Sequence, residues 1–316
     1  MTRVPRSGRA LKTDEANVGT TYEYLIGIDG GGTGTRARVE RADGMPAGYG
    51  TAGPSGLMHG VDNAWRAVLA AIEQAFAKAG TARPPLAGMA VGFGLAGVHN
   101  KQWAAEFAAR NPGFGAIVVE TDAFATLIGA HGGQPGAIVA TGTGSVGEAL
   151  LPNGERREVG GWGFPSSDEA SGAWLGLRAI NYVQRVLDGR DAPGDFAREL
   201  IARCGGDRDG VFVWLANANQ TAYAQLAPIV LGHADKDKVA HDIMTDAGNE
   251  VAKIADALDP SGALPIALCG GLAEPLHAYL PERLLRRIVK PQADAAAGAL
   301  RILRRHLSQP HLQGEQ

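Results

Sequence analysis

The chain has few cysteines, few aromatic residues and little net charge. Cys204 and Cys269 are its only cysteines and lie far apart, which is not the pattern of a disulfide framework or a CxxC metal site. A reducing cytoplasm is therefore the predicted compartment. No run of about 18 apolar residues occurs, so no membrane span is expected. A formal net charge of −3 gives no basic footprint for nucleic acid.

The length of 316 residues suits two domains better than one small core. Residues 1–21 are polar and slightly basic and have no apolar stretch of the kind found in a secretory signal. We predict a disordered extension there, and a frayed tail over residues 308–316.

Two stretches of the chain follow one plan. Residues 24–50 and 136–161 each begin with an apolar strand, turn through glycines and a threonine, and continue as two short strands. Asp43-Gly44 and Asn153-Gly154 favour the hairpin turns. Because a glycine-rich turn after a strand presents backbone N–H groups to anions, two such turns could hold a polyphosphate from two sides. The duplication indicates nucleotide-dependent phosphoryl transfer.

The order of predicted elements repeats as well. The first half reads as three strands, a helix, a strand, a helix, a strand and a helix. The second half starts in the same way, and a mostly helical insertion over residues 190–232 interrupts it. Alternating strands and helices imply sheets covered on both faces. We therefore expect two related α/β domains with a cleft between them.

The segment GIDGGGT, residues 27–33, places a carboxylate at the end of a buried strand. Asp29 could hold Mg²⁺ through water, since this ion binds few protein oxygens. Gly30, Gly31 and Gly32 would let the backbone approach phosphate, and Thr33 could donate to it. The alternative is a hairpin turn with a capping aspartate.

Two further glycine turns follow predicted strands, and the first of them, ATGTGS, lacks the acid. ATGTGS contains Gly142, Thr143 and Gly144, and LCGGLAE contains Gly270 and Gly271 in a strand-to-helix turn suited to adenosine or phosphate. Each turn alone could be purely structural. In combination with the first motif they favour a nucleotide site.

These motifs, in this order, resemble the sugar kinase/actin/heat-shock ATPase superfamily. The segments GIDGGGT, TDAFATLIGAH, ATGTGS, VGGWGFPSSDEASGAWLG and VKPQADAAAGAL are similar to the BadF/BadG/BcrA/BcrD-type ATPase branch, which includes glucosamine and N-acetylglucosamine kinases. The resemblance implies duplicated ribonuclease-H-like (actin-like) domains over residues 22–124 and 125–291. It also implies that a C-terminal helix over residues 292–307 packs back on the first domain, and that the hinge lies near residues 122–136.

The resemblance further implies roles for single residues. Asp29 would position metal-bound phosphates, and Asp122 would be the general base facing the 6-hydroxyl of a sugar. The remaining residues would cradle phosphate (Thr143, Gly144), contact nucleotide (Gly270, Gly271) or lie along the sugar (Gly161, Trp162, Asp168). The implied cofactors are ATP and Mg²⁺, and the implied assembly is a homodimer.

The position of Asp122 supports its role independently. It follows a predicted strand, AIVVET, and open α/β sheets bind ligands at the carboxyl ends of their strands. Phosphoryl transfer needs an in-line hydroxyl, charge neutralisation and an acceptor for the hydroxyl proton. The alternative is that Asp122 only caps the helix that follows.

Other candidates are more ambiguous. Ser166 and Glu169 have the spacing of a capping box, which predicts a helix start there and a structural Glu169. Asp168 would suit the first turn of that helix or accept from a sugar hydroxyl. Trp162 between two glycines suggests a ligand platform. The scattered histidines His99, His131 and His233 have no ligand spacing and are predicted at the surface or at helix ends.

The chain departs from the family pattern at two places. Ser55 and Gly56 stand where an asparagine commonly touches the sugar, and the turn at residues 94–97 lacks a serine. Ser55 could replace one sugar contact. The predicted activity is ATP-dependent phosphorylation of glucosamine at its 6-hydroxyl, and N-acetylglucosamine is the alternative substrate. An activator ATPase is disfavoured because its iron–sulfur cluster needs cysteines. A non-catalytic sugar sensor is disfavoured because residues 1–21 are too short for a helix-turn-helix.

Overall fold

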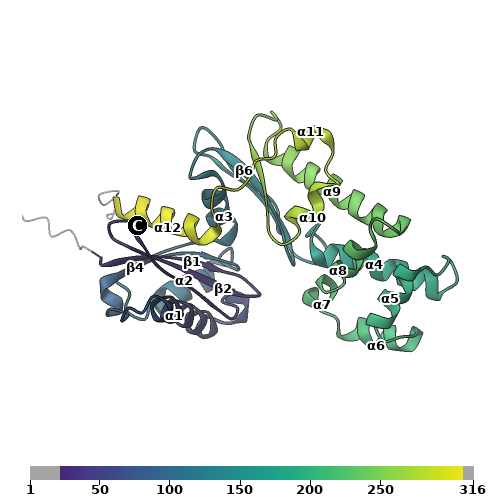
Figure 1. The fold of residues 1–316 in the computed structure, drawn as a ribbon, viewed down its shortest axis with the longest axis horizontal. Coiled ribbons are helices and arrows are strands. Elements are labelled where there is room, and N and C mark those ends of the chain that lie inside the picture. The colour runs from purple at the N-terminus through teal and green to yellow at the C-terminus, as the bar shows by residue number, and fades with distance from the viewer. Residues whose placement is uncertain (1–21, 309–316) are drawn as a thin grey trace, which may run out of the picture.

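The computed structural model describes residues 22–308. The predicted extension at residues 1–21 and the tail beyond residue 308 lie outside the described residues. The chain forms two lobes, each built on one mixed β-sheet with helices on both sides (Figure 1). Among residues 22–308, no helix has both the length and the apolar character needed to cross a bilayer.

The first sheet has the strand order β3-β2-β1-β4-β5, in which β1, β4 and β5 are parallel and β2 and β3 form antiparallel hairpins. Its strands are β1 (Tyr24–Gly30), β2 (Thr35–Arg41), β3 (Pro46–Ala52), β4 (Met89–Leu95) and β5 (Ala116–Thr121).

The second sheet repeats this order as β8-β7-β6-β9, with β6 and β9 parallel. Its strands are β6 (Gly136–Thr141), β7 (Ser145–Leu150), β8 (Arg156–Gly160) and β9 (Ile266–Cys269). A single parallel bridge between Ile266 and Ile288 takes the place of a fifth strand. The predicted duplication is thus confirmed.

The helices of the first lobe and the junction are η1 (Leu57–His59), α1 (Val61–Lys78), η2 (Leu86–Gly88), α2 (Lys101–Ala109), α3 (Asp122–His131) and α12 (Ala295–Ser308). Those of the second lobe are α4 (Gly172–Leu187), α5 (Asp195–Arg203), α6 (Arg208–Asn217), α7 (Gln220–Ala224), α8 (Ala227–His233), α9 (Lys238–Leu258), α10 (Ala273–His277) and α11 (Glu282–Leu285).

Helices α1 and α12 cover opposite faces of the first sheet (Figure 1). The apolar stripe of α1 is buried, and Trp65 stacks on Phe107 of α2 with ring centroids 4.1 Å apart. Helix α12 approaches the sheet so closely that a Cβ at Gly27 of β1 or Gly92 of β4 would overlap its backbone. Small residues at these positions therefore set the distance between α12 and the strands.

The long helix of the second lobe starts later than its sequence pattern predicts. Helix α4 begins at Gly172, and the hydroxyl of Ser171 caps it by accepting from the N–H of Trp174. Asp168 and Ala170 both have left-handed backbone conformations, with φ of 65° and 64°, which a right-handed helix cannot contain. The predicted capping box at Ser166 and Glu169 and the first-turn position of Asp168 are therefore wrong.

Candidate active site

The carboxyl edge of the first sheet brings two predicted acids together. Gly30, Leu95 and Thr121 lie at one level across β1, β4 and β5. Asp29 is the penultimate residue of β1, and Asp122 follows β5 directly. The two carboxylates are close enough that the charge of Asp29 raises the pKa of Asp122. Two acids that are far apart in sequence thus lie at the same carboxyl edge of the first sheet.

Asp29 is mostly buried and pairs with Arg36 on the neighbouring strand. Its Oδ2 lies 2.9 Å from Nη1 of Arg36, and 17% of its side chain is exposed. Burial raises the pKa of Asp29, although Arg36 opposes this effect. No group of three or more metal-binding side chains occurs within residues 22–308. A single carboxylate nevertheless fits Mg²⁺, which is often held by one or two carboxylates together with substrate phosphates.

The turn after β1 exposes its residues at the sheet edge. The N–H of Gly31 donates to the carbonyl of Gly34 at 2.9 Å, and Gly32 and Thr33 are exposed. A Cβ at Gly30 would overlap the Ser55 hydroxyl, so this glycine gives the turn its room.

Ser55 itself is fully buried below that turn. Its hydroxyl accepts from Thr35 at 2.7 Å, and its N–H donates to the carbonyl of Gly31. Ser55 therefore supports the turn at residues 30–33 from below, and its contact with a sugar stays a prediction.

Asp122 is the first residue of α3 and not its cap. Thr121 is the cap, and its hydroxyl accepts from the N–H of Phe124 at 3.0 Å. The carboxylate of Asp122 accepts from the N–H of Ala123 at 3.0 Å. Burial raises the pKa of Asp122, the Ala123 N–H lowers it, Asp29 raises it and His99 lowers it. The alternative in which Asp122 acts only as a helix cap is therefore wrong.

The carboxyl edge of the second sheet brings the other two glycine turns side by side. Strands β6 and β9 are parallel neighbours, and the N–H of Leu272 donates to the carbonyl of Thr141. Gly270 has φ of 89°, and a Cβ there would overlap the Thr141 carbonyl. The turn at residues 142–144 also meets α4, because its Gly142 and Thr143 carbonyls accept the first N–H groups of that helix. Gly271 is exposed beside Gly270.

Asp168 lies against the same turn. A Cβ at Gly144 would be 2.7 Å from Oδ2 of Asp168, which accepts from the side chain of Gln220 at 2.7 Å. Burial raises the pKa of Asp168, and the Ser145 N–H and Gln220 oppose this effect. Gln220 belongs to the insertion, where no sequence pattern marks it as a site residue.

The predicted sugar segment follows β8. Gly161 has φ of 72°, and Trp162 is 86% exposed. Before them, Glu158 lies 3.6 Å from Nε2 of His99, a contact between the two lobes. The sequence indicated no site role for either residue, because neither has a motif and the two come from distant segments.

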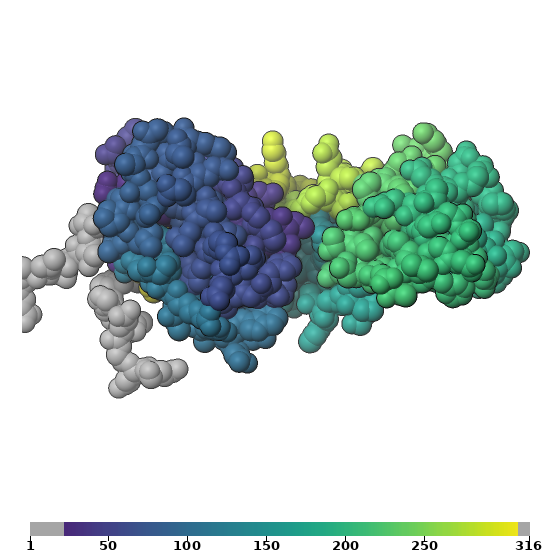
Figure 2. All heavy atoms as spheres, turned by 90° about the horizontal axis from the view of Figure 1, so that it is seen from below, coloured from purple at the N-terminus to yellow at the C-terminus, as the bar shows by residue number. Residues whose placement is uncertain are grey.

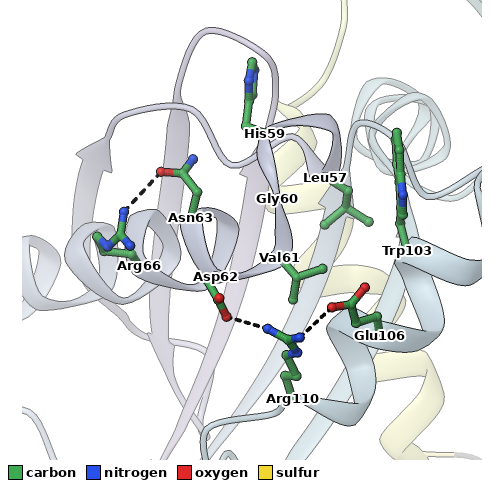
Figure 3. Close-up of a pocket in the computed structure, with 10 residues that line it drawn as sticks. All are labelled: Leu57, His59, Gly60, Val61, Asp62, Asn63, Arg66, Trp103, Glu106 and Arg110. Atoms are coloured by element: carbon green, nitrogen blue, oxygen red, sulfur yellow. Dashed lines mark hydrogen bonds and ion pairs between the residues drawn. The ribbon is translucent and has the colours of Figure 1, made fainter.

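A separate pocket lies on the first lobe between η1, α1 and α2 (Figure 3). Arg110 bridges Asp62 and Glu106 there, and each ion pair is 2.7 Å long. The pocket contains neither Asp29 nor Asp122. We place the candidate site between the lobes instead, where His99 meets Glu158 and where the space-filling view shows the surface hollowed (Figure 2).

Comparisons with known proteins agree with this geometry. A glucosamine kinase of Vibrio cholerae, GspK, is 37% identical over 279 residues, covering 88% of this chain and 94% of that protein. A crystal structure provisionally assigned as an N-acetylglucosamine kinase, from Chromobacterium violaceum, is 49% identical with a TM-score of 0.88. It covers 90% of this chain and 99% of its own.

More distant structures show the fold alone. A ROK family glucokinase of Streptomyces griseus is 20% identical, with a TM-score of 0.54, and the match covers 89% of this chain and 99% of that one. The predicted actin-like architecture is thereby confirmed. The model of the BadF/BadG/BcrA/BcrD ATPase family matches residues 26–302. The chain therefore belongs to the BadF/BadG/BcrA/BcrD ATPase family.

Proposed function

We propose that this protein is an ATP- and Mg²⁺-dependent kinase that phosphorylates glucosamine at its 6-hydroxyl. The observation that carries the proposal is the buried Asp122 carboxylate at the carboxyl edge of three parallel strands, close to Asp29. The similarity to the glucosamine kinase of Vibrio cholerae over most of both chains supports the substrate.

In this proposal Asp122 accepts the proton of the 6-hydroxyl as that oxygen bonds to the γ-phosphorus of ATP, while the bond from this phosphorus to the bridging oxygen of the β-phosphate breaks and ADP leaves. Burial raises the pKa of Asp122, which makes its carboxylate a stronger proton acceptor than that of an exposed aspartate. The Ala123 N–H fixes one carboxylate oxygen and leaves the other for the substrate.

The phosphates would lie between the exposed turn at residues 30–33 and the turn at residues 142–144. Mg²⁺, held by Asp29 through water, would neutralise the phosphate charge. The turn at Gly270 and Gly271 lies next to the 142–144 turn and suits the rest of the nucleotide. Asp168, already held by Gln220, would accept from a sugar hydroxyl, and Gly161 and Trp162 would border the sugar.

We further propose that residues 22–124 together with α12 move against residues 125–291, and that closure of the lobes excludes water during transfer. The contacts of α12 with β1 and β4 support grouping this helix with the first lobe, and its contacts with α3 mark α3 as the junction between the two moving parts. A homodimer in a reducing cytoplasm rests on the resemblance to the family and on the two free cysteines. Analytical ultracentrifugation tests the dimer.

N-acetylglucosamine is the second candidate substrate. The Chromobacterium violaceum structure favours it by name, as does a 25% identical N-acetylmuramic acid/N-acetylglucosamine kinase of Clostridium acetobutylicum, which covers 89% of this chain and 98% of that protein. The absence of the family's sugar-contacting asparagine near Gly56 favours glucosamine, which carries a free amine, over the acetylated sugar.

The test is coupled ADP release with glucosamine, N-acetylglucosamine, glucose and mannose at matched concentrations. We expect glucosamine to give the highest kcat/KM and the acetylated sugar to be at least about tenfold worse, a difference of about 1.4 kcal/mol. A higher value for N-acetylglucosamine would reassign the substrate and leave the phosphotransfer intact. Absence of sugar-dependent ADP release with all four would refute the kinase.

A further inference from the structure

Strand β8 has two distinct faces, and one of them points toward the first lobe. Arg157 reaches the carbonyl of Leu258 on α9, behind the second sheet. Arg156 points the other way: its guanidinium lies 3.5 Å from the ring centroid of Phe124 and 3.1 Å from Glu120. Because side chains alternate along a strand, Glu158 shares the face of Arg156.

Arg156 lies on the same face as Glu158 but forms its ion pairs with other carboxylates. Its guanidinium is already held between Glu120 and the buried Glu148, at 3.1 Å and 2.8 Å. The side chain that meets Glu158 is instead the imidazole of His99, whose Nε2 lies 3.6 Å from Oε1 of Glu158. Both side chains of this pair are about half exposed, at 41% for Glu158 and 56% for His99. Glu158 is therefore a carboxylate that a ligand could reach.

Glu158 is also close to the proposed sugar position on two sides. His99 lies within electrostatic reach of Asp122, whose carboxylate it stabilises. A Cβ at Gly161 would lie 3.5 Å from Oε1 of Glu158, so the carboxylate borders the segment proposed to line the sugar. The residue thus stands between the proposed base and the sugar segment.

We propose that Glu158 determines specificity for the amino sugar by binding the positively charged C2 ammonium of glucosamine. The inference rests on the proposed function. A carboxylate accepts strongly from an ammonium group, whereas a neutral hydroxyl or acetamido group at C2 gains much less from its charge. In the absence of sugar, the imidazole of His99 contacts the carboxylate of Glu158, and the C2 ammonium replaces this contact when glucosamine binds.

The experiment compares wild type, Glu158→Gln and the control Glu155→Gln, which alters an exposed glutamate in the β7–β8 turn. Steady-state kinetics are measured with glucosamine and with glucose, which carries a neutral hydroxyl at C2. We expect Glu158→Gln to raise KM for glucosamine about tenfold or more, as for loss of a charge-assisted hydrogen bond. We expect KM for glucose to change less than twofold and kcat for both sugars less than threefold.

Glu158→Asp keeps the charge and should retain part of the preference for glucosamine, which separates a charge effect from a folding effect. Titration with a non-hydrolysable ATP analogue checks that each variant is folded. Equal losses with both sugars, or an unchanged KM for glucosamine, would overturn the role of Glu158 while leaving the kinase assignment intact. Failure of the wild type to use glucosamine would overturn both.

Discussion

Replacement of Asp122 by asparagine separates proton transfer from every structural role of this residue. Asparagine keeps the oxygen that accepts from Ala123, and the cap of α3 belongs to Thr121, so neither local contact is lost. Burial raises the pKa of Asp122, which means that folding disfavours its charged form. The neutral amide removes this cost, so the melting temperature should stay constant or rise.

The rate should respond in the opposite way. Loss of a general base typically lowers the rate by roughly 10²–10⁴-fold, or about 3–5 kcal/mol of transition-state stabilisation. We expect kcat of Asp122→Asn to fall by that factor, with the affinity for a non-hydrolysable ATP analogue nearly unchanged in isothermal titration. In the wild type, activity should be lost as pH falls through the raised pKa of Asp122, because the protonated acid cannot accept a proton.

Thr121→Ala is the matched control for this experiment. It removes the cap, which should cost about 1 kcal/mol of stability, and it retains the base. We therefore expect a lower melting temperature with a much smaller loss of kcat. If Asp122→Asn lost less than threefold in kcat, the base would lie elsewhere, and Asp168 would be the next candidate.

Two further predictions concern the other buried carboxylates. Asp29→Ala should keep a native circular dichroism spectrum, because its partner Arg36 is 60% exposed and remains solvated, but should lose most ADP release at every Mg²⁺ concentration; near-native turnover would remove Asp29 from the site. Burial raises the pKa of Glu148 to about 7 from 4.5, so the folded protein binds more protons than the unfolded chain between these values and its stability should fall as pH rises through this window. Glu148→Gln should reduce this fall in thermal unfolding between pH 5 and 8 by up to roughly 3 kcal/mol, and parallel curves for the two proteins would contradict it.

The repeated strand order was predictable because both halves carry the same local signals: an apolar strand, a glycine turn and a hairpin dipeptide. Local signals were insufficient at residues 166–171. The capping-box spacing is present, but Asp168 is buried against Gly144 and Gln220 and its backbone is left-handed. The helix therefore begins only at Gly172. This tertiary contact spans 52 positions and has no counterpart in the local pattern.

The positions of the candidate site residues in the fold were predictable to different degrees. Asp29 lies at the end of a strand, Asp122 and the glycine turns follow strands, and strand ends meet at a sheet edge in any fold of this class. Arg156, Glu158 and His99 make contacts between the lobes, which depend on how the two sheets are placed relative to each other. Nothing in their immediate sequence carries that information.

The packing of α12 has a consequence for synthesis of the chain. The backbone of this helix touches Gly27 and Gly92, so one face of β1 and β4 is completed by residues 295–308. All strands of the first sheet leave the ribosome well before that helix does. Until then, the apolar face that α12 covers, including Leu25 and Ala90, has no native cover. Native packing of the first lobe is therefore completed only after the second lobe has been synthesised. Until that point, chaperones or other incomplete chains can bind the exposed apolar face of the nascent chain.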